Sequence, residues 1–221
     1  MILNNKFDYR PLTKEEVNGS RKYNTPDGKK LVSVTTILSK TKDMTFLNEW
    51  KKLVGEKEAT RIVTEASGLG NGMHNLLEKY ILGQEMKGQL MTKILANLII
   101  KNGLCNVDEV WGTEVSLYSK DLYAGTTDVI GLHNGTPSII DFKNSLKEKK
   151  KEWIEDYFMQ LCAYAIAHNE MYNTNINKGV IMMATRDGKY LEFVIEGDEF
   201  THYEIMWANK VCSYYDNLDK Y

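Results

Sequence analysis

Two aspartates and a lysine stand in neighbouring runs of β-branched residues that are typical of two β-strands. Asp128 lies in the first run, and Asp141 and Lys143 lie in the second. Asn134 and Gly135, between the runs, favour a two-residue hairpin turn, and the register of that turn places Asp128 directly opposite Asp141. Like charges in facing positions are destabilising. The pair therefore predicts a divalent cation between the two carboxylates.

The chemistry expected of this group is that of a hard metal site beside a lysine. Side chains alternate along a strand, so Asp141 and Lys143 share one face. Carboxylate oxygens suit Mg²⁺ or Mn²⁺. A lysine beside such an ion can orient or deprotonate an attacking water and can offset charge that develops at phosphorus. We therefore expect metal-assisted hydrolysis of a phosphodiester.

A histidine on a neighbouring helix is a third candidate ligand. The sequence predicts a glycine-rich break over residues 66–72 and then a helix over residues 73–82. His74 and Glu78 are four residues apart and share a face of that helix. A lone helical histidine is more often structural, but the glycines before it permit close backbone approach. An imidazole ligand would favour Mn²⁺ over Mg²⁺.

An upstream strand carries another acid. Glu114 lies on a predicted strand over residues 110–118. If the next connection spans residues 119–121, Glu114 falls opposite Thr126 and on the same face as Asp128.

A lysine-rich segment and a helix follow the hairpin. The lysines have two open interpretations, a solvated loop or a group that contacts substrate phosphates. They are Lys147, Lys149, Lys150 and Lys151. The helix, over residues 153–168, stacks Gln160 and Tyr164 at adjacent turns.

The remaining elements must position these residues. We expect a hairpin around Pro26-Asp27-Gly28, a second hairpin around Asp187-Gly188 and amphipathic helices elsewhere. These helices span residues 46–66, 90–100 and 198–218. No repeat, linker or low-complexity tract divides the chain. The expectation is a single domain over residues 1–221 whose N-terminal hairpin and helical extension covers about 1–66.

Composition narrows the class of protein. The 221 residues carry a formal charge of −2, and 43% are hydrophobic and 26% charged, as in an ordinary globular protein. This balance lacks the basic footprint of many nucleic-acid binders, although an acidic metal site can offset a basic groove. Three scattered cysteines give no disulfide or zinc framework. No signal peptide or membrane span is evident, so a cytoplasmic location is expected.

Other reaction classes fit less well. The sequence has no G-x-S-x-G elbow for serine hydrolysis and no G-x-G-x-x-G in a dinucleotide-binding context. A glycosidase stays open on spacing alone, because paired carboxylates suit retaining chemistry. Lys143 and His74 fit that alternative poorly.

The motifs, taken together in their order, resemble the PD-(D/E)XK nucleases, and in particular their RecB-like exonuclease branch. The resemblance covers roughly residues 31 to 220. The matching segments are Gly70-x-Gly72-x-His74-x-x-x-Glu78, Glu114, Gly125-x-x-Asp128, Ile140-Asp141-Phe142-Lys143 and Gln160-x-x-x-Tyr164. Ser33-Val34-Thr35-Thr36-Ile37-Leu38, followed by Trp50, further resembles the mitochondrial genome-maintenance exonucleases and their phage and bacterial relatives.

This resemblance implies an α/β (α+β) fold with a restriction-endonuclease-like core, in which helices flank a mixed central β-sheet. It implies Mg²⁺- or Mn²⁺-dependent cleavage of DNA, with single strands and free ends favoured, in replication, recombination or repair. The expected enzyme is a monomer in the cytoplasm of a bacterium or a phage-infected host. A restriction-like or structure-specific endonuclease and a decayed nucleic-acid-binding module remain alternatives.

The resemblance also implies roles for individual residues. The metal ligands would be His74, Asp128 and Asp141, with the Phe142 carbonyl as an addition. Lys143 would be the catalytic lysine, Gln160 and Tyr164 would position water or phosphate, and Glu114 would assist. Thr127 replaces the proline that names the superfamily, as is common in this branch. The four cysteines of the iron–sulfur members are absent.

Overall fold

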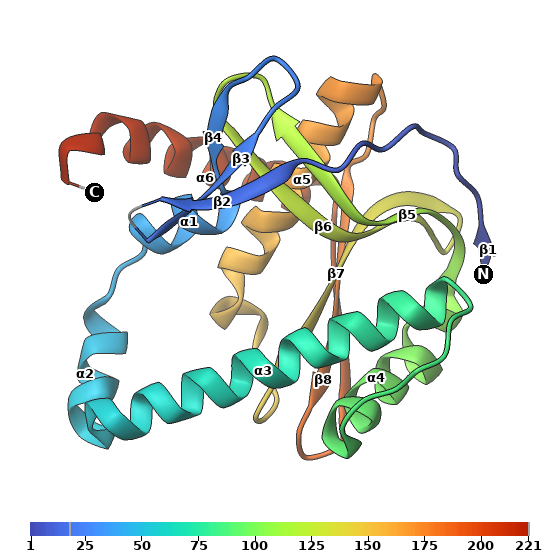
Figure 1. The fold of residues 1–221 in the computed structure, drawn as a ribbon, viewed down its shortest axis with the longest axis horizontal. Coiled ribbons are helices and arrows are strands. Elements are labelled where there is room, and N and C mark those ends of the chain that lie inside the picture. The colour runs from blue at the N-terminus through green and yellow to red at the C-terminus, as the bar shows by residue number, and fades with distance from the viewer. Residues whose placement is uncertain (18, 221) are drawn as a thin grey trace.

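A six-stranded mixed sheet with helices on both faces forms the centre of the molecule (Figure 1). The computed structural model describes residues 1–17 and 19–220. The strand order is β1-β5-β6-β7-β8-β9, and β7 pairs in parallel with β8 while β5, β6 and β7 are antiparallel neighbours. The strands are β1 (Ile2–Leu3), β5 (Val107–Ser119), β6 (Tyr123–His133), β7 (Thr136–Ser145), β8 (Lys178–Thr185) and β9 (Tyr190–Glu196). The predicted fold class is confirmed.

The helices divide between two apolar cores, one on each face of the sheet. Val180 and Ile181, successive residues of β8, belong to different cores, as strand alternation requires. The helices are α1 (Val34–Lys40), α2 (Thr45–Val54), α3 (Glu56–Ile81), α4 (Leu90–Asn102), α5 (Glu155–Tyr172) and α6 (Gly197–Asp216). Short 3₁₀ helices span Leu104–Asn106, Lys151–Trp153 and Leu218–Lys220. Within the described residues, no helix is both long enough and apolar enough to span a bilayer.

A second, three-stranded sheet precedes α1. It consists of β2 (Thr13–Val17), β3 (Ser20–Asn24) and β4 (Lys30–Val32), and β3 and β4 flank the predicted turn at Pro26-Asp27-Gly28. This N-terminal sheet is tied to the central sheet by a hydrogen bond of 3.2 Å between Tyr23 Oη and Thr126 Oγ1. Ser33 then caps α1 by accepting a hydrogen bond from the Thr36 amide.

The predicted break over residues 66–72 is wrong, because α3 runs without interruption through its glycines (Figure 1). Two of these glycines, Gly70 and Gly72, serve close packing instead. A Cβ atom at Gly70 would lie 2.7 Å from Asn144 Nδ2 of β7, and one at Gly72 would lie 2.6 Å from Thr92 Cγ2 of α4. Glycine in a helix costs stability through the conformational entropy it loses on folding. A larger residue at either position would clash with these neighbours, so glycine is needed there. The sequence prediction of one helix from 46 to 66 also changes, since Gly55 separates α2 from α3.

Candidate active site

The β6–β7 hairpin has the predicted register. Its pairs run from His133↔Thr136 to Val129↔Ile140, with Asn134 and Gly135 in the turn at φ of 49° and 74°. The positive φ values match the turn type that the Asn-Gly dipeptide favours.

The ladder ends one residue before Asp128 and Asp141 would pair. Instead, Asp128 Oδ2 accepts a hydrogen bond of 2.6 Å from the Phe142 amide. The carboxylate thus takes the place of a backbone acceptor where the two strands separate. The prediction that Asp128 pairs directly with Asp141 is therefore corrected. The Asp128 carboxylate is instead hydrogen-bonded to the amide of Phe142, the residue after Asp141.

Glu114 stands at the same level of the sheet on β5. The pairs on either side of it are Thr113↔Val129 and Val115↔Thr127, so Glu114 falls opposite Asp128 rather than opposite Thr126 as predicted. The error of two residues arises because the β5–β6 pairing extends to Ser119↔Tyr123 and the turn comes later than expected. Glu114 has a φ of 49°, a left-handed conformation that costs a non-glycine residue on the order of 1 kcal/mol.

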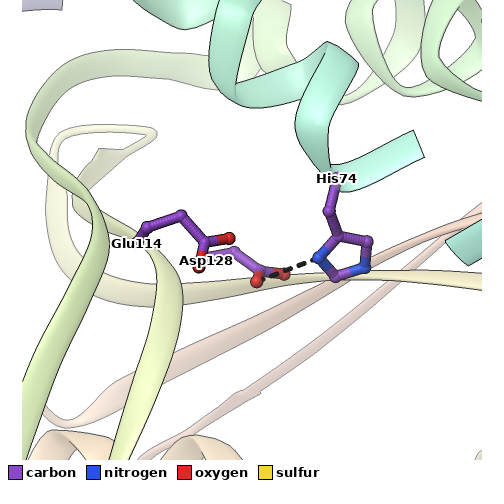
Figure 2. Close-up of side chains that lie close together, drawn as sticks. All are labelled: His74, Glu114 and Asp128. Atoms are coloured by element: carbon purple, nitrogen blue, oxygen red, sulfur yellow. Dashed lines mark hydrogen bonds and ion pairs between the residues drawn. The ribbon is translucent and has the colours of Figure 1, made fainter. Parts of the chain in front are cut away.

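A helix brings His74 to these two acids. Its Nδ1 lies 3.1 Å from Asp128 Oδ1. One donor atom from each of His74, Glu114 and Asp128 lies within 4.8 Å of the others. Figure 2 shows the three side chains converging from α3, β5 and β6. This cluster, His74–Glu114–Asp128, is called the acidic site below.

Asp141 and Lys143 form a second group, whose charges interact with those of Asp128 and His74. Lys143 Nζ lies 2.5 Å from Asp141 Oδ2. The Asp141 side chain is 3% exposed and the Lys143 side chain is 18% exposed. Gln160 of α5 links the pair to Tyr164. Its Oε1 accepts from Lys143 Nζ at 3.2 Å, while its Nε2 donates to Asp141 Oδ1 at 3.3 Å and to Tyr164 Oη at 3.1 Å.

Charge and burial shift the pKa values of both groups. Burial alone would lower the pKa of His74, but the negative charge of Asp128 outweighs it and the pKa rises. Burial and the nearby Asp128 raise the pKa of Glu114. Burial raises the pKa of Asp141 to about 6, although Lys143 opposes this. The lysine pKa is raised despite burial, because Asp141 and Asp128 stabilise the ammonium.

The acidic site fits a divalent cation. His74 Nδ1 is within hydrogen-bond distance of Asp128 Oδ1, and one donor atom of each of the three residues lies within 4.8 Å of the others, close enough for a single cation to be shared. Two carboxylates and one imidazole suit Mg²⁺ or Mn²⁺. The predicted ligand set was His74, Asp128 and Asp141. In the structure Glu114 joins the first two, whereas the carboxylate of Asp141 contacts Lys143 and Gln160.

The four predicted phosphate-binding lysines follow the end of β7. Lys147, Lys149 and Lys150 are exposed, and Lys150 Nζ lies 5.5 Å from the centre of the Trp153 ring. Lys151 is committed elsewhere, with its Nζ 2.6 Å from Glu199 Oε1. None of the four is among the residues that line the cleft at the acidic site.

That cleft has a volume of about 480 Å³. It contains the acidic site, Gln160 and Tyr164, and its walls include residues that the sequence did not single out. These are Lys14, Arg21 and Tyr23 of the N-terminal sheet and Asn71 and Asn75 of α3. Asn71 precedes His74 by three residues, a helical spacing that could have indicated it, and Asn75 follows Asn71 by four residues.

Comparisons with known proteins add an independent finding. No protein-family model matches the chain. Over 173 residues the chain is 30% identical to the mitochondrial genome maintenance exonuclease 1 of Xenopus tropicalis, an alignment that covers 71% of this chain and 49% of the relative. The chain thus spans about half the length of the curated relative, and the resemblance predicted from the motifs is confirmed.

Solved structures show weaker likeness. A protein named SSO0001 matches with a TM-score of 0.45 and 17% identity, covering 84% of this chain and 76% of that one. A candidate exonuclease from Eubacterium rectale matches with a TM-score of 0.46 and 14% identity, covering 65% and 63%.

Proposed function

We propose that this chain is a PD-(D/E)XK nuclease of the RecB-like branch, which hydrolyses phosphodiester bonds of single-stranded DNA from a free end with Mg²⁺ or Mn²⁺. The observation that carries the proposal is the proximity of two groups. An acidic site whose donor atoms could share a cation lies within electrostatic reach of a buried Asp141–Lys143 pair. The relative named as an exonuclease supports the same reaction class.

The residues of the acidic site would hold the metal. His74, Glu114 and Asp128 supply the donor atoms, and Asp141 lies near enough for its charge to act on Asp128 and His74. When bound, a divalent cation would polarise the scissile phosphodiester as a Lewis acid and neutralise these carboxylates. The hydrogen bond from the Phe142 amide fixes Asp128 for this task, because it holds one oxygen while the other faces His74.

Lys143 supplies a proton-bearing group at a fixed position. Its raised pKa keeps Nζ protonated at neutral pH, so it can donate a hydrogen bond to negative charge that develops on a phosphate oxygen. Asp141, with a pKa of about 6, is mainly ionised at pH 7 and holds the ammonium in place. Gln160 bonds to both members of the pair and to Tyr164, which restricts the lysine to one orientation.

The geometry favours this chemistry over glycoside hydrolysis. A retaining glycosidase needs one carboxylic acid and one carboxylate facing the sugar. Here Asp141 is paired with a lysine, and the two cleft carboxylates Glu114 and Asp128 lie with an imidazole at ligand spacing. We further propose that the chain acts as a single-domain monomer on strands that arise in DNA replication, recombination or repair.

Digestion of labelled DNA tests the proposal. Linear single-stranded, linear double-stranded and circular single-stranded DNA are incubated with Mg²⁺, Mn²⁺ or a chelator, and each end of the linear strand is blocked in turn. We expect metal-dependent loss of the linear single strand, suppression by one blocked end and survival of the circle. Cleavage of the circle would indicate an endonuclease, and persistence of every substrate with either metal would contradict a nuclease.

A further inference from the structure

One wall of the cleft belongs to the N-terminal sheet, outside the elements that carry the catalytic motifs. Lys14 pairs with Tyr23 across β2 and β3, and Glu16 pairs with Arg21 two positions along. Strand alternation places Lys14 and Arg21 on the same face as Tyr23. All three residues line the cleft.

This wall has a fixed position relative to the acidic site. Tyr23 is 2% exposed, and its hydroxyl lies 3.2 Å from Thr126 Oγ1, two residues before Asp128 on β6. Lys14 Nζ lies 5.5 Å from the centre of the Tyr23 ring. The positive charge of Lys14 is near enough to act on the carboxylate of Glu114. The two cations therefore stand at a set place in the cleft.

Lys14 and Arg21 differ in their pairing from Lys30 of the same sheet and from Lys29, the residue before it. Lys30 is bound to Glu15 at 2.8 Å, and Lys29 is bound to Asp27 at 3.1 Å. Within the part of the chain that the structure describes, no ion pair engages Lys14 or Arg21. Their charges are therefore available to a ligand.

The charges that line the cleft are unevenly distributed. Its carboxylates are Glu78, Glu114 and Asp128, and the last two belong to the acidic site. An anionic strand would be repelled by these groups wherever a bound metal does not neutralise them. Among the cleft-lining residues, Lys14 and Arg21 carry the lysine and arginine charges, and both belong to the N-terminal sheet.

The cleft continues beyond Arg21. A second hollow of about 210 Å³ lies against α1 and shares Arg21 and Thr35 with the cleft. Thr35 and Ser39 are exposed there and offer hydroxyl groups, while Glu16 supplies one carboxylate. A polymer bound at the acidic site can extend past Arg21 into the second hollow, whereas a small ligand at the acidic site would not occupy both.

We propose that Lys14 and Arg21 bind backbone phosphates of the DNA strand next to the scissile bond, so that the N-terminal sheet forms the substrate-binding wall of the cleft. The inference rests on the proposed nuclease function. Arg and Lys side chains are the usual partners of phosphate oxygens, and such contacts position a strand without reading its sequence. Because no ion pair engages either cation within the described residues, each phosphate contact would contribute to affinity through the release of counterions.

Binding measurements with charge-removing variants test this inference. Lys14→Ala, Arg21→Ala and the double variant are made in a Lys143→Ala background, so that a fluorescein-labelled oligo-deoxythymidine is bound without being cut. Fluorescence anisotropy is measured with Mg²⁺ between about 50 and 200 mM salt. Lys22→Ala is the matched control, because Lys22 lies on β3 beside Arg21 but does not line the cleft.

We expect each single variant to weaken binding roughly five- to tenfold. The slope of log affinity against log salt should fall by about 0.7 for each phosphate contact removed from a single strand. Arg21→Lys should restore part of the affinity, and Lys22→Ala should change neither quantity. With native Lys143, Lys14→Ala and Arg21→Ala should raise KM for DNA while kcat at saturation stays close to that of the unchanged chain.

Two failures can be told apart. If the unchanged chain does not degrade DNA, the proposed function fails. If it degrades DNA but the double variant binds with the affinity and salt slope of the Lys22→Ala control, the inference about the N-terminal sheet is overturned and the proposed function stands.

Discussion

His74 lies on α3 at the acidic site, whereas His168 lies on α5 in a cluster of aromatic rings formed with Phe7, Tyr9 and Tyr172. Carboxylates raise the pKa of His74 in spite of burial. Burial lowers the pKa of His168 to about 4, and the Lys6 charge acts in the same direction. The hydrogen-bond partners of His168 in the described part of the chain are uncharged, with Tyr9 Oη 2.9 Å from Nε2 and Thr174 Oγ1 2.7 Å from Nδ1.

The two regions therefore contribute differently to folding. In the aromatic cluster the polar atoms of the histidine are satisfied by uncharged groups, and the rings pack on one another at 4.9 to 5.8 Å. At the acidic site and the neighbouring Asp141–Lys143 pair, burial and like charge raise the pKa of Glu114 and of Asp141, so these groups in their ionised form oppose folding at neutral pH. A functional site holds groups in positions that their own electrostatics disfavour, and the rest of the fold supplies the stability.

The largest expected effect is on catalysis. Lys143→Ala should reduce the rate of DNA degradation by roughly 100- to 1,000-fold, because it removes the donor that faces developing charge. Asp141 is then left buried without its ammonium and takes up a proton, so the fold persists with reduced stability. The rate of DNA degradation at saturating DNA tests the loss of activity, and circular dichroism tests whether the variant is folded. Lys101→Ala, an exposed change on α4, is the control, and equal rates for both variants would refute the role of Lys143.

A pH titration separates the two histidines. The pKa of His168 is about 4 when folded and near 6.5 when unfolded, so the unfolded chain binds more protons between these values. Stability should fall as pH decreases from 6.5 to 4, by at most roughly 3 kcal/mol from this group. Urea unfolding across this pH range should show that the free energy of unfolding declines less steeply for His168→Gln than for the unchanged chain. Parallel curves for the two proteins would show that the neutral imidazole is not the cause.

Truncation of the aromatic cluster should affect stability and leave the chemistry intact. Phe7 contacts four rings, at 5.1 to 5.8 Å, including that of Trp111. Phe7→Ala should lower the free energy of unfolding by about 2 kcal/mol, and Phe7→Leu should lower it by less. The nuclease rate, measured well below the melting temperature, should stay unchanged. A large loss of rate in the folded Phe7→Ala protein would mean that the two regions are not independent.

The smallest effect should come from the acidic site without metal. Glu114→Gln removes a charge that the folded state disfavours, so the chain should gain a few tenths of a kcal/mol in chelator at pH 7, a value reduced by solvent screening. The same variant should show a smaller rise in melting temperature with Mn²⁺, since one ligand is weakened. Equal Mn²⁺ shifts for Glu114→Gln and the unchanged chain would exclude Glu114 as a ligand.

The sequence predicted those parts of the site that depend on local rules. The Asn134-Gly135 turn sets the β6–β7 register through backbone geometry that only a few residues accept, so the prediction was correct to the residue. The helical spacing of Gln160 and Tyr164 likewise placed both side chains on one face of α5, where they bond to each other.

Predictions that depend on distant contacts were less successful. The β5–β6 register was shifted by two residues because its turn, which begins at Lys120 with φ of 35°, carries no strong dipeptide signal. The glycines of α3 were interpreted as a break because their reason, contact with Asn144 and Thr92, lies elsewhere in the chain. The same limit hid Lys14 and Arg21, which reach the cleft only when the N-terminal sheet folds onto β6.

Gly70 sets the distance between α3 and β7. Only a hydrogen separates its Cα from the side chain of Asn144, the residue that follows Lys143 on β7, and Asn144 in turn donates to the Ala66 carbonyl at 3.3 Å. His74 is one helical turn further along the same rigid rod. The absence of a side chain at Gly70 therefore sets how closely α3 approaches β7, and with it the separation between the His74 imidazole and Lys143, although Gly70 contacts neither residue. A random-mutagenesis screen for lost nuclease activity should therefore recover Gly70 alongside the residues that meet the substrate.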